Sequence, residues 1–352
     1  YSIAFAPGNN FFGGLQYFGL KGVGLDNDQA LAPTIPHQLF MIYQCMFAII
    51  TPALISGAVV ERMKFKTFLV FMLLWSLLVY CPVAHWVWGG GWLGGMGAMD
   101  FAGGTVVHVL AGFSALVAAM LVGQRRDYQR QPLRPHNLPF TLLGAGLLWF
   151  GWFGFNAGSA VSSGELAAAA FVNTNTATAA AMLAWMLLDL IMRKEVTALG
   201  AATGAVAGLV GITPAAGFVS PMGALALGAM VSCVCYFAAN WRAKSKLDDS
   251  LDAFAVHGVG GFTGAVLTGV FATSAMKIYN PATQPGLIEG HIGTVFTQLI
   301  AAASCAVYAM VMSFILLKIL DATMGLRVSE ESEQRGLDIT EQGEEAYGES
   351  VT

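Results

Sequence analysis

Two stretches of the chain, DFAGGTVVHVLAGF (100–113) and DSLDAFAVHGVGGF (249–262), carry the same pattern. Each begins with an aspartate, has a histidine eight residues later, and continues with Gly-Phe four and five residues after the histidine. Both stretches open apolar runs, and because a helix rises 1.5 Å per residue, each histidine is expected about 12 Å into its span. The pattern therefore predicts two histidines at matching depth near the centre of a bilayer.

The composition around these stretches excludes a water-soluble protein. Of the 352 residues, 56% are hydrophobic and 11% are charged, whereas soluble domains average about 45–50% apolar and about 25% charged residues. The net charge of −4 offers no basic excess, which excludes nucleic-acid binding as a main role. The five cysteines lie in or beside apolar runs, so they are expected to pack rather than to form a disulfide framework.

Nine apolar runs are long enough to cross a bilayer as helices, because about 20 residues span the hydrocarbon core. Their limits are 37–60, 66–84, 101–123, 138–157, 165–192, 198–214, 221–240, 253–274 and 292–320. In the sixth run, Gly200, Gly204 and Gly208 are spaced four apart, which predicts a helix face in close contact with another helix. The sequence therefore predicts an all-α polytopic membrane protein.

The lysines and arginines between these runs are concentrated in alternate connections, which lie on the same side of the membrane. Fifteen of the 17 lie in every second connection or in the tail, and only Lys21 and Lys277 lie elsewhere. Because positive residues are retained on the cytoplasmic side, residues 1–36 are predicted outside and the carboxyl-terminal tail inside. The chain is thus expected to comprise a membrane domain, 1–320, and a polar cytoplasmic tail, 321–352, of a multi-pass protein of the cytoplasmic (inner) membrane.

The charge pattern gives the two histidine stretches opposite directions. The helix after Asp100 is predicted to run inward and the helix after Asp249 outward, so together they form an inverted repeat. Functional sites of such repeats lie near the midplane, where His108 and His257 are expected to meet. The alternative is that each histidine only donates to a neighbouring carbonyl and stabilises helix packing.

The histidine distribution favours neither a metal site nor an enzyme. Two histidines without cysteines or intramembrane carboxylates are fewer than the three protein ligands usual for catalytic zinc, so no metal is expected. Membrane metal hydroxylases need histidines clustered at short spacing, and no span here contains two. The remaining histidines lie at span ends or in loops, where anchoring or capping is expected; they are His37, His85, His136 and His291.

Four motifs stand in order along the chain: AHWVWGGGWL (84–93), DFAGGTVVH (100–108), GWFGFNAGSA (151–160) and VHGVGG (256–261). They resemble the ammonium transporters of the Amt/Mep/Rh family, and the tail GLDITEQGEEAY (336–347) is most similar to the bacterial Amt branch. The resemblance covers practically the whole chain and implies the family's inverted-repeat bundle of eleven helices. Because nine spans are predicted and the chain opens with YSIAFAPGNNFFGG, it is expected to lack the first helices of that fold.

The resemblance implies an outer cation site. Trp88, Phe47 and Ser159 match a vestibule that recruits the ammonium cation, and aromatic faces together with a hydroxyl oxygen suit that task. Phe47 and Phe155 match a stacked pair that closes the outer pore. Asp100 matches a structural aspartate that supports the vestibule. From the residues alone, an apolar helix face or an interfacial belt explains most of the aromatic side chains, and Trp88 would be assigned to such a belt.

The same resemblance makes His108 and His257 the paired histidines of the pore. A charged group at the midplane costs about 2.5–3.5 kcal/mol or more, whereas ammonia is neutral. A pore that binds NH₄⁺ outside, removes its proton and passes NH₃ between apolar walls excludes K⁺, which has no proton to release. Transport of ammonium, with methylammonium as an analogue, is therefore expected, without enzyme activity and without a cofactor.

Further partners and two alternatives follow from the resemblance. The implied partners are membrane lipid, two further copies of the chain in a homotrimer with one pore per subunit, and a cytoplasmic signal protein of the PII type. One alternative is a Rh-like gas channel without an outer cation site, which Trp88 and Ser159 disfavour. The other is an ammonium sensor that signals through its tail, although the tail of about 30 residues holds no recognisable signalling domain.

Overall fold

Apolar helices of membrane-spanning length form most of the chain in the computed structural model, which describes residues 1–130 and 135–345. Within those residues, eight helical segments are long and apolar enough to cross a bilayer, and a ninth apolar helix, α9 (Ala198–Ile212), is shorter. The eight are His37–Ala58, Phe65–Gly95, Gly104–Val122, Leu138–Ala160, Glu165–Arg193, Pro221–Lys244, Phe254–Phe271 and Ile292–Met324. Each predicted run corresponds to one of these nine segments, which confirms the predicted all-α polytopic fold.

Several crossing segments combine an α-helix with a shorter helical piece. The α-helices are α1 (Ser2–Phe5), α2 (His37–Ile55), α3 (Phe65–Trp75), α4 (Cys81–Trp88), α5 (Trp92–Gly95), α6 (Leu110–Val122), α7 (Leu138–Asn156), α8 (Glu165–Arg193), α9, α10 (Pro221–Lys244), α11 (Gly260–Phe271), α12 (Ile292–Met324) and α13 (Glu330–Arg335). The 3₁₀ and π pieces are η1 (Phe18–Leu20), η2 (Ser56–Ala58), η3 (Ser76–Tyr80), η4 (Gly104–Val109), η5 (Ala157–Ala160), η6 (Phe254–Val259), η7 (Ser274–Met276), η8 (Leu287–Glu289) and η9 (Asp338–Gln342). Before α2, β1 (Asn27–Asp28) and β2 (Ala32–Pro36) form a small antiparallel pair.

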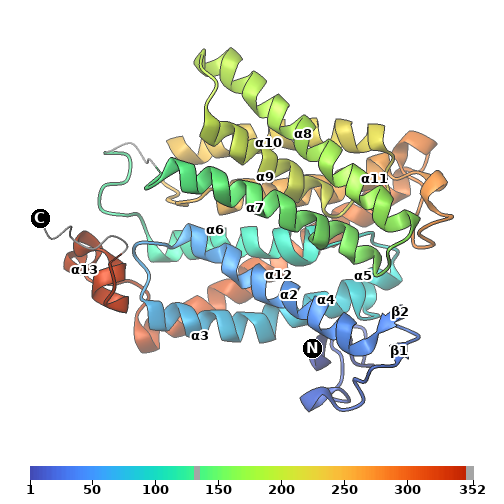
Figure 1. The fold of residues 1–352 in the computed structure, drawn as a ribbon. Coiled ribbons are helices and arrows are strands. Elements are labelled where there is room, and N and C mark those ends of the chain that lie inside the picture. The colour runs from blue at the N-terminus through green and yellow to red at the C-terminus, as the bar shows by residue number, and fades with distance from the viewer. Residues whose placement is uncertain (131–134, 346–352) are drawn as a thin grey trace, which may run out of the picture.

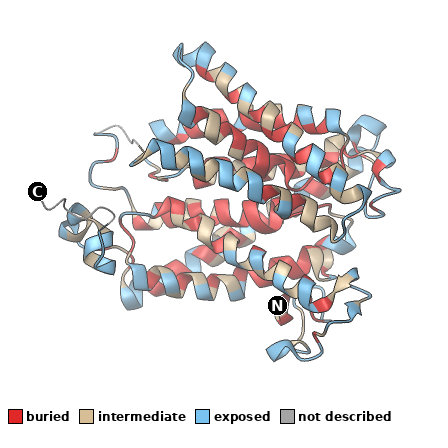
Figure 2. Ribbon diagram, viewed as in Figure 1, coloured by how far each residue is buried: buried red, intermediate tan, exposed pale blue. Residues whose placement is uncertain are grey.

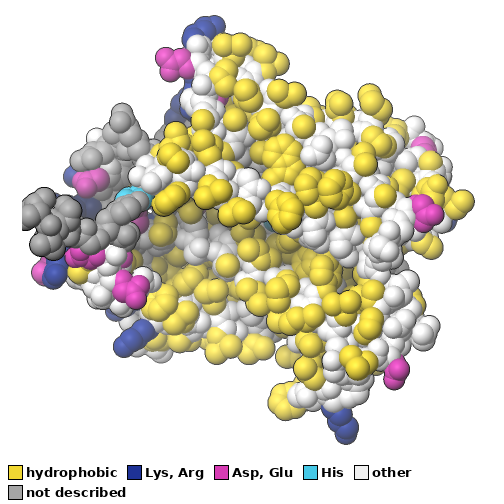
Figure 3. Space-filling model, in the orientation of Figure 1, with side chains coloured by type: hydrophobic (Ala, Val, Ile, Leu, Met, Phe, Trp, Pro, Cys, Tyr) yellow, Lys and Arg dark blue, Asp and Glu magenta, His cyan; other side chains and the backbone are white. Residues whose placement is uncertain are grey.

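The bundle has two halves, each with its own buried apolar core (Figure 1). One half contains α2, α3, α4, α6 and α12, and the other contains α7 to α11. Buried residues lie inside both halves (Figure 2), while leucine, isoleucine and phenylalanine side chains remain exposed on the flank. In Figure 3, hydrophobic side chains cover the flank of the bundle, and charged side chains lie mainly toward its two ends. This distribution is what a lipid-facing bundle requires.

Three connections that carry lysine or arginine residues (56–64, 123–130 and 245–253) meet at one end of the bundle, which we call the basic end. The buried Arg62 side chain joins them by donating to the carbonyls of Gly123 and Asp248. The chain after α12 packs on the same end, since Lys64 N–H donates to Leu326 O at 2.9 Å. A set of buried hydrogen bonds therefore connects these loops to the segment that follows α12.

Glycines bring α9 close to α8, as their spacing predicts. A Cβ at Gly204 would lie 2.5 Å from Trp185 Cβ, and a Cβ at Gly208 would lie 2.5 Å from Ala181 Cβ. Gly200 of α9 faces Asp189 of α8. Only a residue without a side chain permits this backbone approach, so α9 packs within the membrane domain despite its shortness.

The two histidine stretches share an unusual local structure. η4 and η6 are π-helical, and each continues directly into an α-helix, α6 or α11. π-Helical turns are rare and are frequent at functional sites. Gly103, with φ of 110°, precedes η4 in the left-handed region that favours glycine, so this helix begins three residues later than the predicted start at 101.

Candidate functional site

The two repeated histidines contact each other inside the bundle. His108 Nδ1 and His257 Nδ1 are 3.2 Å apart, and the ring centroids are 5.2 Å apart with an interplanar angle of 28°. One of these nitrogens carries the hydrogen and the other accepts it. His108 is 1% exposed, and its Nε2 has no hydrogen-bond partner among the described residues. A buried imidazole nitrogen thus remains free to accept from, or donate to, a small molecule.

Glycines of the repeat allow this contact. A Cβ at Gly112 would collide with the backbone of Gly258, and a Cβ at Gly261 would lie 2.7 Å from His108 Cβ. η4 packs against α11 while η6 packs against α6, so the start of each helix meets the later part of the other. This reciprocal packing is the arrangement of an inverted pair. The small residue four positions after each histidine therefore brings the opposite histidine within reach.

Each aspartate of the repeat accepts hydrogen bonds at the start of its π-helical segment. The Asp100 carboxylate accepts from the N–H groups of Gly103 at 2.8 Å, Gly104 at 2.6 Å and Thr105 at 2.8 Å, and also from the Thr105 hydroxyl. The Asp249 carboxylate accepts from the N–H groups of Ala253 at 3.0 Å and Phe254 at 2.7 Å. Both carboxylates satisfy donors that have no partner within the helix.

A column of aromatic rings leads from Trp88 to the histidines. Trp88 lies 5.7 Å from Phe47, and Phe47 lies 4.7 Å from Phe155, measured between ring centroids. Phe155 in turn stacks on His108 at 5.9 Å with an interplanar angle of 17°. The Trp88 indole N–H donates to the backbone carbonyl of Asp100 at 2.8 Å. The structure thus brings together the side chains that the motifs singled out, and connects the column to the capped start of η4.

Ser159 lies beside this column, one turn after Phe155. Its hydroxyl donates to the Phe155 carbonyl at 2.8 Å and lies 3.0 Å from the Tyr43 hydroxyl. Tyr43, Phe47 and Phe155 also line a cavity of about 300 Å³ between α2 and α7. Of the predicted outer residues, Phe47 lines this cavity, and its lining does not include Trp88 or Ser159.

Two residues of this region were not singled out from the sequence. Trp152 stacks on His108 with centroids 5.4 Å apart and an angle of 18°, and its indole N–H donates to Thr213 at 2.9 Å. Tyr43 packs against Phe47 at 5.1 Å. Helical spacing offered a signal, because Tyr43 precedes Phe47 by four residues and Trp152 precedes Phe155 by three.

Two of the other histidines have polar partners at the end of the bundle opposite the basic end. His85 contacts the carbonyls of Ala4 at 2.9 Å and Asn9 at 2.7 Å, and His37 contacts the Tyr1 hydroxyl at 2.7 Å. Among the residues that the structure describes, no group of three histidine, cysteine, aspartate or glutamate side chains is placed to hold a metal ion. The geometry of His37 and His85 is that of side chains that stabilise the fold.

Comparison with known proteins identifies the family to which this chain belongs. The ammonium transporter family model matches residues 1–347. The chain belongs to the ammonium transporter family. It is 49% identical to an ammonium transporter of Bacillus subtilis over 352 residues, which cover 100% of this chain and 86% of that protein. It is also 45% identical to the ammonium transporter Amt1 of Archaeoglobus fulgidus, covering 99% and 85% of the two chains.

A solved structure agrees with this membership. The crystal structure of Saccharomyces cerevisiae Mep2 superposes with a TM-score of 0.90 at 37% identity, covering 100% of this chain and 80% of that one. The ammonium transporter family consists of transporters and not of enzymes, as predicted. This family member is a multi-pass membrane protein, and ammonium transport is its function.

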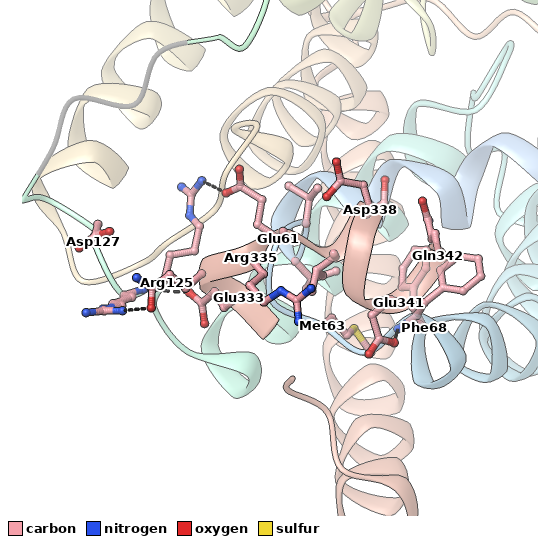
Figure 4. A pocket seen from close by; sticks show the side chains of 18 of the residues that line it. Glu61, Met63, Phe68, Arg125, Asp127, Glu333, Arg335, Asp338, Glu341 and Gln342 are labelled. Carbon is pink, nitrogen blue, oxygen red and sulfur yellow. Dashed lines mark hydrogen bonds and ion pairs between the residues drawn. The ribbon is translucent and has the colours of Figure 1, made fainter. Parts of the chain in front are cut away.

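A second, larger cavity lies at the basic end of this ammonium transporter family member. Its volume is about 1160 Å³, and side chains from the α2–α3 connection, from residues 125–128 and from the tail line it (Figure 4). Arg126 Nη1 donates to Gln334 at 3.0 Å, and the Phe65 N–H donates to Glu341 at 3.1 Å. The cavity shares no lining residue with the aromatic column, so it belongs to the contact between tail and loops.

Proposed function

We propose that the protein recruits NH₄⁺ at the outer aromatic residues, separates its proton, and passes NH₃ along an apolar path lined by His108 and His257. The observation that carries this proposal is the contact between the two buried imidazoles at the end of the aromatic column. A pair of stacked histidines with an unpartnered nitrogen suits a small neutral molecule that both donates and accepts hydrogen bonds.

Recruitment rests on Trp88, Phe47 and Ser159. Ring faces attract a small cation, with a contribution of about 0.5–2 kcal/mol per contact. Because the Ser159 hydroxyl hydrogen is donated to the Phe155 carbonyl, its oxygen presents a lone pair to an N–H donor. Asp100 supports this site indirectly, since its carbonyl accepts from the Trp88 indole while its carboxylate holds the start of η4.

Passage favours the neutral form. The Phe47 and Phe155 rings, 4.7 Å apart, close the way between the outer site and His108. A bare cation between such rings has lost its hydration, and the penalty for a charge near the midplane is several kcal/mol. Leaving the proton behind removes that penalty for ammonia. A potassium ion cannot lower its cost in this way.

The histidine geometry permits the proton to move separately. With the shared hydrogen on His108 Nδ1, His257 carries its own hydrogen on Nε2, and His108 Nε2 is an acceptor. A proton taken up at His108 Nε2 displaces the shared hydrogen toward His257 Nδ1, and His257 Nε2–H releases a proton on the other side. Proton and NH₃ then cross near each other but as separate species.

Assembly and regulation extend the proposal. We place the protein in the cytoplasmic membrane with 1–320 as the transport domain and 321–352 as a cytoplasmic tail. It acts as a homotrimer with one pore per subunit, and a PII-type signal protein caps the basic end. The weak burial of α7, where only 6% of the apolar stretch is covered, leaves a flank for other subunits or lipid. The mass of the detergent-solubilised complex tests the trimer.

Trp88→Leu tests the outer site. In reconstituted vesicles, the half-saturation concentration for methylammonium should rise roughly threefold to thirtyfold, which is the equivalent of one cation–π contact. Trp241→Leu is a matched control, because Trp241 is 58% exposed on the flank of α10. Unchanged half-saturation in a normally folded Trp88→Leu protein contradicts cation recruitment and favours a gas channel of the Rh type.

A further inference from the structure

Tyr43 lies where the outer side chains meet, although the proposed transport steps give it no role. It precedes Phe47 by one turn of α2, and the two rings are 5.1 Å apart at an angle of 75°. The Tyr43 hydroxyl oxygen lies 2.8 Å from the Phe155 carbonyl oxygen and 3.0 Å from Ser159 Oγ. It also lies 3.2 Å from the Gly154 carbonyl oxygen. One phenol group therefore contacts both gate residues and the serine.

Gly158 permits this close approach. A Cβ at Gly158 would lie 3.1 Å from the Tyr43 hydroxyl oxygen and 3.3 Å from Cε2 of its ring. The ring is thus held between the Gly158 backbone on one side and the Phe47 ring on the other. A side chain packed in this way has little rotational freedom, so the position of its hydroxyl is well defined.

The hydrogens of the two hydroxyl groups are both used within this cluster. Ser159 Oγ–H donates to the Phe155 carbonyl at 2.8 Å. The Tyr43 O–H has the Phe155 and Gly154 carbonyls and Ser159 Oγ as acceptors within reach. What remains on both oxygens is lone pairs, which accept hydrogen bonds and cannot donate. Both NH₄⁺ and NH₃ can donate to these oxygens, but the N–H groups of the cation make the stronger, charge-assisted hydrogen bonds.

We infer that Tyr43 is a positioning residue that determines the specificity of the outer site: its hydroxyl holds Ser159 as a hydrogen-bond acceptor and links α2 to α7 beside the Phe47–Phe155 pair. The inference rests on the proposed outer cation site and extends it. It makes the preference for the N–H cation over ammonia a property of the Tyr43–Ser159 pair. The aromatic rings then supply attraction to positive charge, and the two oxygens supply the directional contacts.

Tyr43→Phe keeps the ring and removes the hydroxyl. In vesicles containing the whole chain, the half-saturation concentration for methylammonium should rise roughly threefold to tenfold, as expected for one hydrogen bond, with the maximal rate nearly unchanged. Tyr308→Phe is the matched control, because the Tyr308 hydroxyl donates to the Leu78 carbonyl at 2.8 Å and does not contact the column. An unchanged half-saturation in a folded Tyr43→Phe protein overturns the inference.

A double-mutant cycle with Ser159→Ala separates positioning from plain packing. If the two hydroxyls act as one unit, the double variant should raise half-saturation by clearly less than the product of the single effects. Independent, multiplying effects contradict the inference. If Tyr43→Phe does not fold, Gly158→Ala displaces the intact phenol instead, and it should raise half-saturation in the same way; a normal value there overturns the inference.

Trp88→Leu in the same assay distinguishes failure of the inference from failure of the proposed function. If Trp88→Leu raises half-saturation while Tyr43→Phe does not, the outer site stands and the role of Tyr43 is wrong. If neither variant changes half-saturation, the outer cation site itself is wrong, and the inference about Tyr43 is wrong with it. If half-saturation rises in both Trp88→Leu and Tyr43→Phe while Tyr308→Phe transports normally, the outer cation site and the role of Tyr43 are both supported.

Discussion

The two histidine stretches, one after Asp100 and one after Asp249, repeat the same residues but are anchored in different surroundings. The Asp100 carboxylate accepts from four successive N–H groups, those of Gly103, Gly104, Thr105 and Val106, and from the Thr105 hydroxyl. The Asp100 carbonyl accepts from the Trp88 indole. Asp249 accepts from only two N–H groups among the described residues, and burial raises the pKa of its carboxyl to about 6. The first stretch is thus tied to the aromatic column, and the second to the basic end. The two stretches therefore share a backbone geometry but differ in the residues that surround it.

The aromatic neighbours differ in the same way. His108 stacks on Trp152 and Phe155, whereas His257 stacks on His108 itself. His108 therefore faces the aromatic column, and in the proposed mechanism His257 continues the path away from it. If this division is real, equivalent substitutions in the two stretches must have unequal effects.

The largest expected effect is on transport by histidine variants. His108→Leu should lower charge-coupled uptake at least about a hundredfold, because a positioned proton-transfer group contributes about that much. His257→Leu should leave cation recruitment intact but block proton release. Currents and methylammonium uptake in vesicles, with K⁺ as competitor, measure both. Wild-type rates and selectivity in the two variants would show that the pair only stabilises packing.

His108→Glu sharpens the comparison further. A carboxylate near the column offsets the desolvation of K⁺ as readily as that of NH₄⁺, so this variant should conduct K⁺. Retained exclusion of K⁺ in a folded His108→Glu protein is incompatible with a selectivity role for the imidazole pair.

The next largest expected effect is a difference in stability between variants of the two aspartates. Asp100→Asn places an amide where a carboxylate oxygen accepts from backbone donors, which leaves buried N–H groups unpaired at about 1–3 kcal/mol each. Asp249→Asn disturbs fewer hydrogen bonds and removes a buried charge, so its cost at neutral pH should be near zero. Thermal unfolding in detergent compares the two. Equal destabilisation would show that the halves are anchored alike.

A pH dependence distinguishes Asp249. Because burial raises the pKa of this carboxyl to about 6 in the folded protein, above an unfolded value of 3.8, its contribution favours folding at low pH. Stability should therefore fall as pH rises from about 4 to above 6, by on the order of 2–3 kcal/mol. The Asp249→Asn protein should lack this slope. A wild-type slope of the opposite sign over the same range contradicts the assignment.

The smallest effect is expected from the reciprocal glycines. Gly112→Ala would place a methyl group against the Gly258 backbone, whereas Gly261→Ala meets His108 Cβ at 2.7 Å, a side-chain atom. Overpacking costs about 1–3 kcal/mol, and we expect Gly112→Ala to be the more destabilising by about 1 kcal/mol. Gly146→Ala is the control, because no atom lies within 4 Å of the position that its new methyl group would take. If Gly261→Ala lowers the thermal stability more than Gly112→Ala, the contact of Gly112 with the Gly258 backbone is not the tighter of the two.

Much of this architecture was predictable from local patterns. Apolar runs of about 20 residues indicate membrane helices because no other backbone arrangement except a closed barrel satisfies its hydrogen bonds in lipid. The four-residue spacing of Gly204 and Gly208 predicted close contact with another helix, and the structure shows that this helix is α8. Helix starts were predicted less well, since the first turn after Asp100 depends on the left-handed Gly103 and on side-chain capping, which hydropathy does not register.

The candidate site was only partly predictable. The eight-residue offset of Asp100 and His108, repeated in Asp249 and His257, indicated matching depth. It did not indicate which ring nitrogens would meet, or that Trp152 would cover His108. Tyr43 was missed because a tyrosine on an apolar helix has no distinguishing pattern until its hydroxyl is seen beside Ser159.

Patterns along the chain were enough to define the spans and the residue types at each repeat position, because hydropathy and glycine spacing act locally along a helix. Which atoms lie in contact became clear only from the folded bundle. The 3.2 Å between the two imidazoles, the bond from Trp88 to the Asp100 carbonyl and the Tyr43–Ser159 pair join residues from different helices. Such distances depend on how two helices cross, and the crossing is set by close packing of many side chains at once.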